Sequence, residues 1–169
     1  KNVIILPNNK NIFMAAQSAT EVVDVNAAVV ETRTVPQGFR SLLAFDPNQS
    51  IEANVEAMTV SLSDVTSGSV TLAVRDTTID GLEIHENDIL GMVDGKILVS
   101  TPDMDQALLD TFDKMIDEDS EIVMIYVGEE GNQEQAQALA EKLEEAHEDI
   151  EVEIFQGDQP VYPYLFSVE

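Results

Sequence analysis

The chain has 169 residues, of which 33 are acidic and 8 are basic, so its formal net charge is −25; it contains no cysteine. This length suits one domain with a real core, and the lack of cysteine excludes disulfides and thiolate chemistry within these residues. A field this negative repels phosphate backbones and anionic headgroups, which argues against nucleic-acid or membrane-surface binding. A basic protein partner fits this charge, and so does a surface that is acidic only for solubility.

The chain has no run of apolar residues near the roughly 20 needed to span a bilayer, and no basic-then-apolar leader. We therefore expect a cytoplasmic protein without membrane insertion. The first residue is Lys1, and an apolar run begins two residues later at Val3. This start predicts a single domain, residues 1–169, excised from a longer chain.

Strands and helices are predicted to alternate over the first half of the chain. Apolar runs predict strands, and apolar residues at helical spacing predict helices that Pro36 and Ser50 help to start. The predicted strands are 3–6, 27–31 and 70–74, and the predicted helices are 12–23, 36–43 and 51–65. Ser67 and Gly68 are expected to end the last of these helices.

The middle of the chain predicts an antiparallel excursion at about 81–100. Asp80-Gly81 and Asp94-Gly95 are turn signals, because a type I′ turn needs positive φ at both central residues. The segments 89–93 and 96–99 should therefore form a hairpin. The alternation then resumes, with predicted helices at 102–116 and 132–147, strands at 121–127 and 150–155, and a short edge strand at 164–168.

This order predicts an α/β fold: a three-layer sandwich with a mostly parallel sheet and an antiparallel β-hairpin excursion. The sequence contains no Gly-rich phosphate loop and no nucleophile elbow. Its two histidines, His85 and His147, are far apart and do not form a zinc motif. We therefore predict no catalytic residue, no metal and no cofactor in this fragment.

The positions of the predicted strands still indicate a site, since ligands of open α/β sheets bind at the carboxyl ends of the strands. The segments 7–9, 32–34, 75–77 and 128–129 should lie there. Arg33 and Arg75 each follow a predicted strand directly, and Arg40 lies in the helix after Arg33. The candidate ligand- or partner-binding residues are Asn8, Asn9, Arg33, Thr34, Gln37, Arg75 and Asp76.

Two interpretations of the arginines stay open. They are donors for a carboxylate, a phosphate or an acidic partner, or they pair internally with Glu31, Asp46 or Asp76. The first interpretation predicts that Asn8 and Asn9 lie beside Arg33 and Arg75.

Four stretches in combination carry a family resemblance. They are LPNNKNI (6–12), TVPQG (34–38) with LLAFDP (42–47), AVRD (73–76) with DG (80–81), and GDQPVYPY (157–164). Together they resemble the C-terminal domain of the dihydroxyacetone-kinase-like proteins of Gram-positive bacteria, the fatty acid kinase catalytic subunit, whose fold is similar to that of the DegV family.

The resemblance implies a parent phosphotransferase of lipid metabolism, with ATP and Mg²⁺ held by an N-terminal domain and with a middle domain before this one. The parent would phosphorylate a fatty acid presented by a separate lipid-carrying DegV-family subunit. The leading hypothesis is a non-catalytic docking domain for that subunit. The alternatives are a small-molecule module that binds a fatty acid or other carboxylate at the strand-end loops, and an interdomain or homodimer scaffold.

Overall fold

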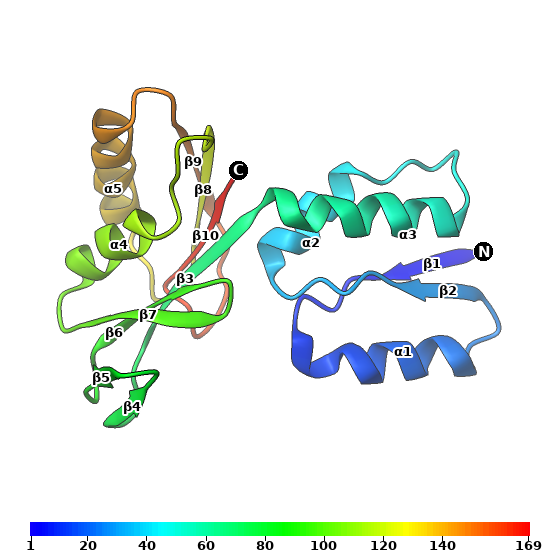
Figure 1. Cartoon of the computed structure of the whole chain (residues 1–169), viewed down its shortest axis with the longest axis horizontal. Helices are drawn as coiled ribbons and strands as arrows, with labels where there is room; N and C mark the ends of the chain where they lie inside the picture. Colours follow the sequence, from blue (N-terminus) through cyan, green and yellow to red (C-terminus); the bar gives the residue numbers. More distant parts are fainter. The chain divides into compact units, whose positions relative to one another are not determined.

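The computed structural model describes residues 1–169 as two compact units, Lys1–Val65 and Thr66–Glu169 (Figure 1). We call them unit 1 and unit 2. The single domain that the sequence predicted over this stretch stays a prediction, since a division by contacts does not test it.

Unit 1 is a small three-layer α/β/α arrangement. Its elements are β1 (Asn2–Ile5), a 3₁₀ turn (Lys10–Ile12), α1 (Phe13–Val22), β2 (Asn26–Val29), α2 (Val35–Leu43), α3 (Ile51–Val60) and a second 3₁₀ turn (Ser61–Asp64). The strands β1 and β2 are parallel and form a two-stranded sheet, in a register that runs from Asn2↔Asn26 to Ile5↔Val29. Helix α1 lies on one face of this sheet and α3 on the other (Figure 1).

The helix starts of unit 1 follow the predicted capping chemistry. Ser50 caps α3 by accepting a hydrogen bond from the Ala53 N–H at 3.2 Å, as predicted. The predicted end of this helix at Ser67-Gly68 is wrong, because both residues lie within strand β3. Gly68 serves close packing instead, since a Cβ there would overlap the sulfur of Met115.

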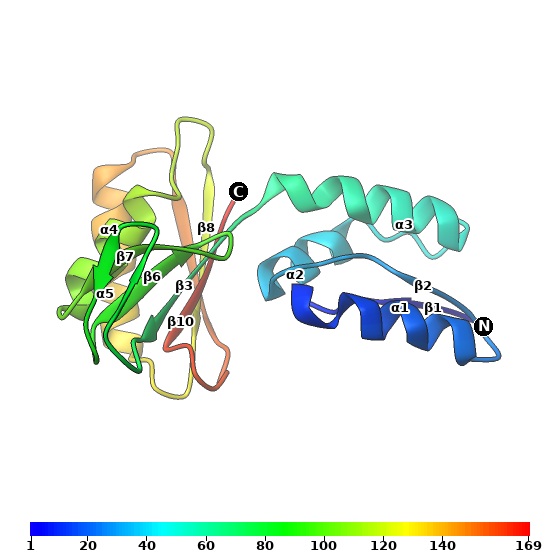
Figure 2. The same ribbon diagram turned by 60° about the horizontal axis from the view of Figure 1, so that its bottom comes forward.

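Unit 2 is a mixed sheet covered by two helices. Its strands are β3 (Thr66–Leu72), β4 (Thr77–Ile79), β5 (Leu82–Ile84), β6 (Ile89–Val93), β7 (Lys96–Thr101), β8 (Ile122–Val127), β9 (Glu151–Gln156) and β10 (Tyr164–Val168), and its helices are α4 (Met104–Asp113) and α5 (Gln133–Ala146). Six strands form one sheet in the order β7-β6-β3-β10-β8-β9, and β4 pairs with β5 in a separate hairpin. Helices α4 and α5 contact each other and pack on the same face of the large sheet (Figures 1 and 2).

The α/β class is confirmed, but parallel pairing is less extensive than expected. Only β1 with β2 and β8 with β9 pair in parallel; the other pairs are antiparallel. The three layers are realised in unit 1, whereas both helices of unit 2 lie on one face. The physical reason is that β6, β7 and β10 join the main sheet, so the predicted excursion is part of its body.

Two further corrections concern β10 and the start of α4. The last strand, β10, is central rather than at an edge, since it pairs with both β3 and β8. Its Phe166 is fully buried and lies 4.6 Å, ring centre to ring centre, from Phe112 of α4. Helix α4 begins at Met104 rather than at the predicted residue 102, and Asp103 caps it by accepting from the Gln106 N–H at 2.8 Å.

The predicted hairpin turns are confirmed. Asp94 and Gly95 have φ of 47° and 82°, and Asp80 and Gly81 have φ of 51° and 85°, as a type I′ turn requires. None of the helices is both long enough and apolar enough to cross a membrane.

Candidate functional site

The carboxyl ends of β1 and β2 meet at one edge of the small sheet. The Val30 N–H donates to the Ile5 carbonyl at 3.1 Å, which extends the ladder just beyond β2. The following loops then touch, because the Asn8 N–H donates to the hydroxyl of Thr32 at 2.9 Å. Thr32 is fully buried, so this bond joins the two loops from the inside. We call these loops, residues 6–9 and 30–34 with the first turn of α2, the strand-end site.

Asn8 is the most constrained residue of the strand-end site. Its φ is 55°, in the left-handed region that asparagine tolerates better than most other residues. Its side chain lies against Gly38 of α2, where a Cβ would overlap the amide oxygen. That oxygen is buried and accepts no hydrogen bond. Its desolvation is therefore uncompensated, which destabilises the loop unless another group supplies a donor.

Three other predicted residues hold the local backbone. The Asn9 side chain accepts from the Asn11 N–H at 2.9 Å and so caps the first 3₁₀ turn. Thr34 caps α2 by accepting from the Gln37 N–H at 3.2 Å, and the Gln37 side chain accepts from the Arg33 N–H at 2.8 Å. These oxygens are already engaged, so they shape the site rather than stand ready for a ligand.

The start of α2 offers few backbone donors. Pro36 has no N–H, and the N–H of Gln37 is taken by Thr34, so an anion would find fewer donors here than at most helix starts. The exposed Arg33 guanidinium is the positive group of these loops. A carboxylate would therefore have to depend on Arg33.

Arg40 bears out internal pairing, but with a different partner from those predicted. It forms an ion pair with Asp64 at 2.8 Å, within unit 1. Glu31, in contrast, accepts a hydrogen bond from Gln17 at 2.7 Å.

Arg75 and Asp76 belong to unit 2. They follow β3, which pairs antiparallel with both of its neighbours and lies in a different sheet from β1 and β2. The premise that placed Arg75 beside Asn8, a shared parallel sheet, is therefore wrong. Asp76 accepts from the Glu86 N–H at 2.7 Å and lies 4.0 Å from the His85 ring nitrogen, so it steadies the β5–β6 loop.

The fourth predicted segment, 128–129, follows β8 and is closed by the chain between β9 and β10. The Gly128 N–H donates to the Pro163 carbonyl at 2.8 Å, and the Glu129 N–H donates to the Gln159 carbonyl at 3.0 Å. A Cβ at Gly128 would overlap the Tyr162 carbonyl. The glycine therefore permits a close backbone approach here.

Sequence reasoning missed Tyr164, which organises the start of α5. Its hydroxyl accepts from the Asn132 N–H at 2.8 Å and donates to the Gln135 side chain at 2.7 Å. Burial raises the pKa of the Tyr164 phenol, and burial likewise raises that of Tyr126. A tyrosine at the start of a strand indicates that its hydroxyl needs a partner, but this partner lies 32 residues away, where no local pattern identifies it.

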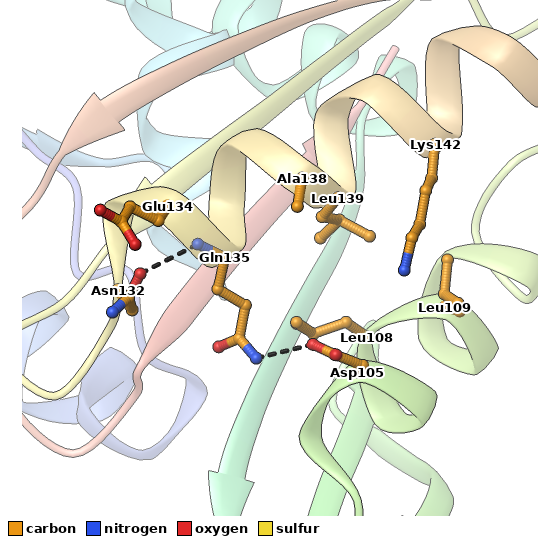
Figure 3. A pocket seen from close by; sticks show the side chains of 9 residues that line it. All are labelled: Asp105, Leu108, Leu109, Asn132, Glu134, Gln135, Ala138, Leu139 and Lys142. Atoms are coloured by element: carbon orange, nitrogen blue, oxygen red, sulfur yellow. Dashed lines mark hydrogen bonds between the residues drawn. The ribbon is translucent and has the colours of Figure 1, made fainter.

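A shallow hollow of about 410 Å³ lies between α4 and α5 (Figure 3). Its floor is apolar, with Leu108 and Leu139 from the two helices. The Gln135 amide donates to Asp105 at 2.7 Å across one end, and Lys142 lies at the other (Figure 3). The same hydrogen bond links the helices, so the hollow is best explained as a packing feature. No group of three or more metal-ligating side chains is assembled in the structure.

Comparison with known proteins places this chain in a family. Residues 1–169 match the family model for FakA-like C-terminal domains, where FakA denotes the A component of fatty acid kinase. The chain is 41% identical to uncharacterized proteins of Staphylococcus aureus strains USA300 and N315, over all of its own length and 31% of theirs. It therefore spans about a third of the curated relatives that it matches.

Solved structures show the same fold at low identity. The fatty acid kinase B3 protein of Streptococcus pneumoniae, loaded with linoleic acid, has a TM-score of 0.65 at 15% identity, with 100% of this chain and 72% of that chain covered. The fatty acid binding DegV family protein of Streptococcus agalactiae has a TM-score of 0.59 at 13% identity (99% and 70% covered), and the dihydroxyacetone kinase of C. freundii has 0.57 at 11% (98% and 38%). The chain belongs to the family of FakA-like C-terminal domains of fatty acid kinase.

Proposed function

We propose that this domain docks the lipid-carrying DegV-family subunit onto a cytoplasmic, ATP-dependent fatty acid kinase. The other parts of the parent protein would hold ATP and Mg²⁺ and transfer the phosphoryl group. This fragment would contribute recognition and no chemistry. Family membership and the DegV-like fold support the assignment to a fatty acid kinase.

The observation that carries the docking role is the segregation of charge. Unit 2 holds 26 acidic and 4 basic residues, a net of −22, whereas unit 1 holds 7 and 4, a net of −3. Four basic residues leave most of the carboxylates in unit 2 unneutralised. Exposed acidic side chains gather along α5 and β9, at Glu141, Glu144, Glu145, Glu148, Asp149, Glu151 and Glu153.

Such a field acts mainly on the rate of encounter. A surface with an excess of charge of one sign attracts an oppositely charged partner, and this raises the association rate more than the final affinity. Salt weakens this steering, because the Debye length is only about 8 Å at physiological ionic strength. The lipid-carrying subunit would accordingly present a basic face to unit 2.

The test is the association rate between the intact parent protein and the lipid-carrying subunit, measured by stopped flow across a salt series. We expect the rate to fall steeply with salt, and the triple variant Glu141→Lys, Glu145→Lys, Glu148→Lys to associate more slowly at low salt. Glu144 is spared because it accepts from the Val152 N–H at 3.0 Å.

The matched control is Glu21→Lys, Asp24→Lys, Glu56→Lys, which makes the same change in net charge at exposed positions of unit 1. Equal slowing by both triples would mean that net charge alone matters. An association rate that is flat across salt and unchanged in the Glu141, Glu145 and Glu148 triple variant would refute steering by this surface.

A second candidate function is binding of a fatty acid or other carboxylate at the strand-end site. It is favoured by Arg33, which is exposed and directly follows Thr32, the residue whose hydroxyl accepts from the Asn8 N–H. Titration of the intact parent with a fluorescent long-chain fatty acid, in the absence of the other subunit, tests it. Saturable binding that Arg33→Gln weakens would favour this function, and no binding would leave docking as the role of the domain.

A further inference from the structure

The small sheet of unit 1 has an open edge along β1. Strand β1 pairs only with β2. The Ile5 carbonyl faces β2, since it accepts from the Val30 N–H. The N–H and C=O of a strand residue point to the same side and alternate along the strand, so those of Ile4 point away from β2. No strand pairs with that side of β1.

A groove follows the same strand. It has a volume of about 360 Å³ and is lined from β1 and the residue after it by Asn2, Ile4 and Leu6, and from α3 by Ile51, Asn54 and Met58. Two more lining residues, Leu42 in the last turn of α2 and Phe45 just after it, are 53% and 46% exposed. The open edge of β1 is thus bordered by apolar surface that water still reaches.

Unit 1 leaves an unusually large share of its apolar side chains exposed. It contains 12 of the 19 exposed large apolar side chains of the chain, although it has 65 of the 169 residues. A two-stranded sheet is marginal in water, and an open apolar edge invites pairing with another strand. The arrangement calls for one more strand beside β1.

We infer that the open edge of β1 binds a parallel strand contributed by the part of the parent protein outside residues 1–169. Helices on both faces are typical of parallel sheets, which favours a parallel strand. A second copy related by a two-fold axis would instead pair β1 with β1 antiparallel. The length of the relatives supports an intramolecular strand, because this chain covers only 31% of them. A tethered strand also has a high effective concentration.

The added strand would change the setting of the strand-end site. Strand β1 would become internal, with β2 on one side and the new strand on the other. The Asn8 loop would then lie between two strand ends, where open α/β sheets form their ligand crevices. The loop after the new strand would complete a site of which this chain supplies one half.

Amide-resolved hydrogen exchange on the intact parent protein tests the inference. The Ile4 amide should exchange at least roughly 100-fold more slowly than the exposed turn amide of Gly81, as expected for a paired strand rather than an open edge. Protection that appears only on adding the lipid-carrying subunit, or only as protein concentration rises, would assign the edge to a partner or a second copy and overturn the inference. So would no protection under any of these conditions.

A proline pair gives an independent readout by thermal unfolding of the intact parent. Ile5→Pro removes the N–H that faces β2, and Ile4→Pro removes the N–H that faces the open edge. Proline is tolerated at an open edge and not within a paired strand. We expect the two variants to lower the melting temperature alike. A tolerated Ile4→Pro beside a destabilising Ile5→Pro would show an open edge in the parent and refute the added strand.

Discussion

The side-chain amide of Asn8 lies directly on the backbone of Gly38, so the loop after β1 contacts the helix after β2 through this one side chain. The contact holds the Asn8 amide oxygen in a buried position without a donor. It also explains a glycine within α2, where an alanine would normally be preferred.

Gly38→Ala should destabilise the protein. Glycine to alanine inside a helix usually stabilises by about 1 kcal/mol, but overpacking costs typically about 1–3 kcal/mol, and here the new Cβ overlaps Asn8. Urea unfolding of the parent protein, followed by a probe in this domain, measures the change. The double variant Asn8→Gly, Gly38→Ala should recover most of the loss, because glycine accepts the φ of 55° and removes the overlapping amide. A stabilising Gly38→Ala would show that Asn8 moves aside at no cost.

Tyr164→Phe should also destabilise, by about 0.5–1.5 kcal/mol, since it removes the hydrogen bond that the Asn132 N–H donates to the hydroxyl. The wild-type hydroxyl should also make the unfolding free energy depend on pH in the alkaline range. Burial raises the pKa of Tyr164 above the ordinary 10.0, so the folded protein holds this proton more tightly than the unfolded chain. The contribution is complete below the unfolded pKa and is lost as pH rises through the folded one. Tyr164→Phe should therefore flatten the alkaline fall in unfolding free energy; an unchanged slope would contradict the assignment.

The loss of unfolding free energy at acidic pH should depend in part on Asp88. Hydrogen bonds from the backbone N–H of His85 (3.1 Å) and the hydroxyl of Ser100 (2.9 Å) lower the pKa of this nearly buried carboxyl from 3.8. A lowered pKa stabilises the fold above the unfolded value, and the contribution is lost as pH falls through the folded value. Asp88→Asn should be less stable near neutral pH and lose less on acidification. Unfolding curves with parallel pH dependence in both proteins would contradict this.

Local chemistry accounts for what the sequence predicted well. The Asp-Gly turns, the Ser50 cap and the helix from Asn132 depend on residues within a few positions of one another, so their signals are complete in a short window. The strand-end contact of Asn8 with Thr32 rests only on two successive parallel strands. The positional rule was sufficient to find it.

The errors have one physical origin, which is pairing between segments distant in sequence. An apolar run such as 164–168 has the same pattern at an edge or at the centre of a sheet, and only its pairing with β3 and β8 makes it central. Arg75 follows a strand just as Arg33 does, yet the direction and sheet of β3 are set by β6 and β10. The bond between the Tyr164 hydroxyl and Asn132 spans 32 residues, beyond the reach of any local pattern.

Replacing a residue by glycine usually destabilises a protein, but at Val161 we expect glycine to stabilise it. It is a β-branched residue with a φ of 73°, an outlier for this residue type. The Tyr162 N–H donates to the Pro160 carbonyl at 2.8 Å, which makes Val161 the centre of a strained three-residue turn. Its side chain is 65% exposed, so it gains little from burial.

Val161→Gly should therefore stabilise the protein, by up to about 1–2 kcal/mol, because glycine adopts positive φ without the steric penalty of a side chain. The gain is reduced by the greater freedom of glycine in the unfolded chain. Val74→Gly is the matched control, since Val74 is 85% exposed and lacks a positive φ. Chemical denaturation of both variants should give opposite signs. If Val161→Gly destabilises as Val74→Gly does, the turn carries no strain that a glycine relieves.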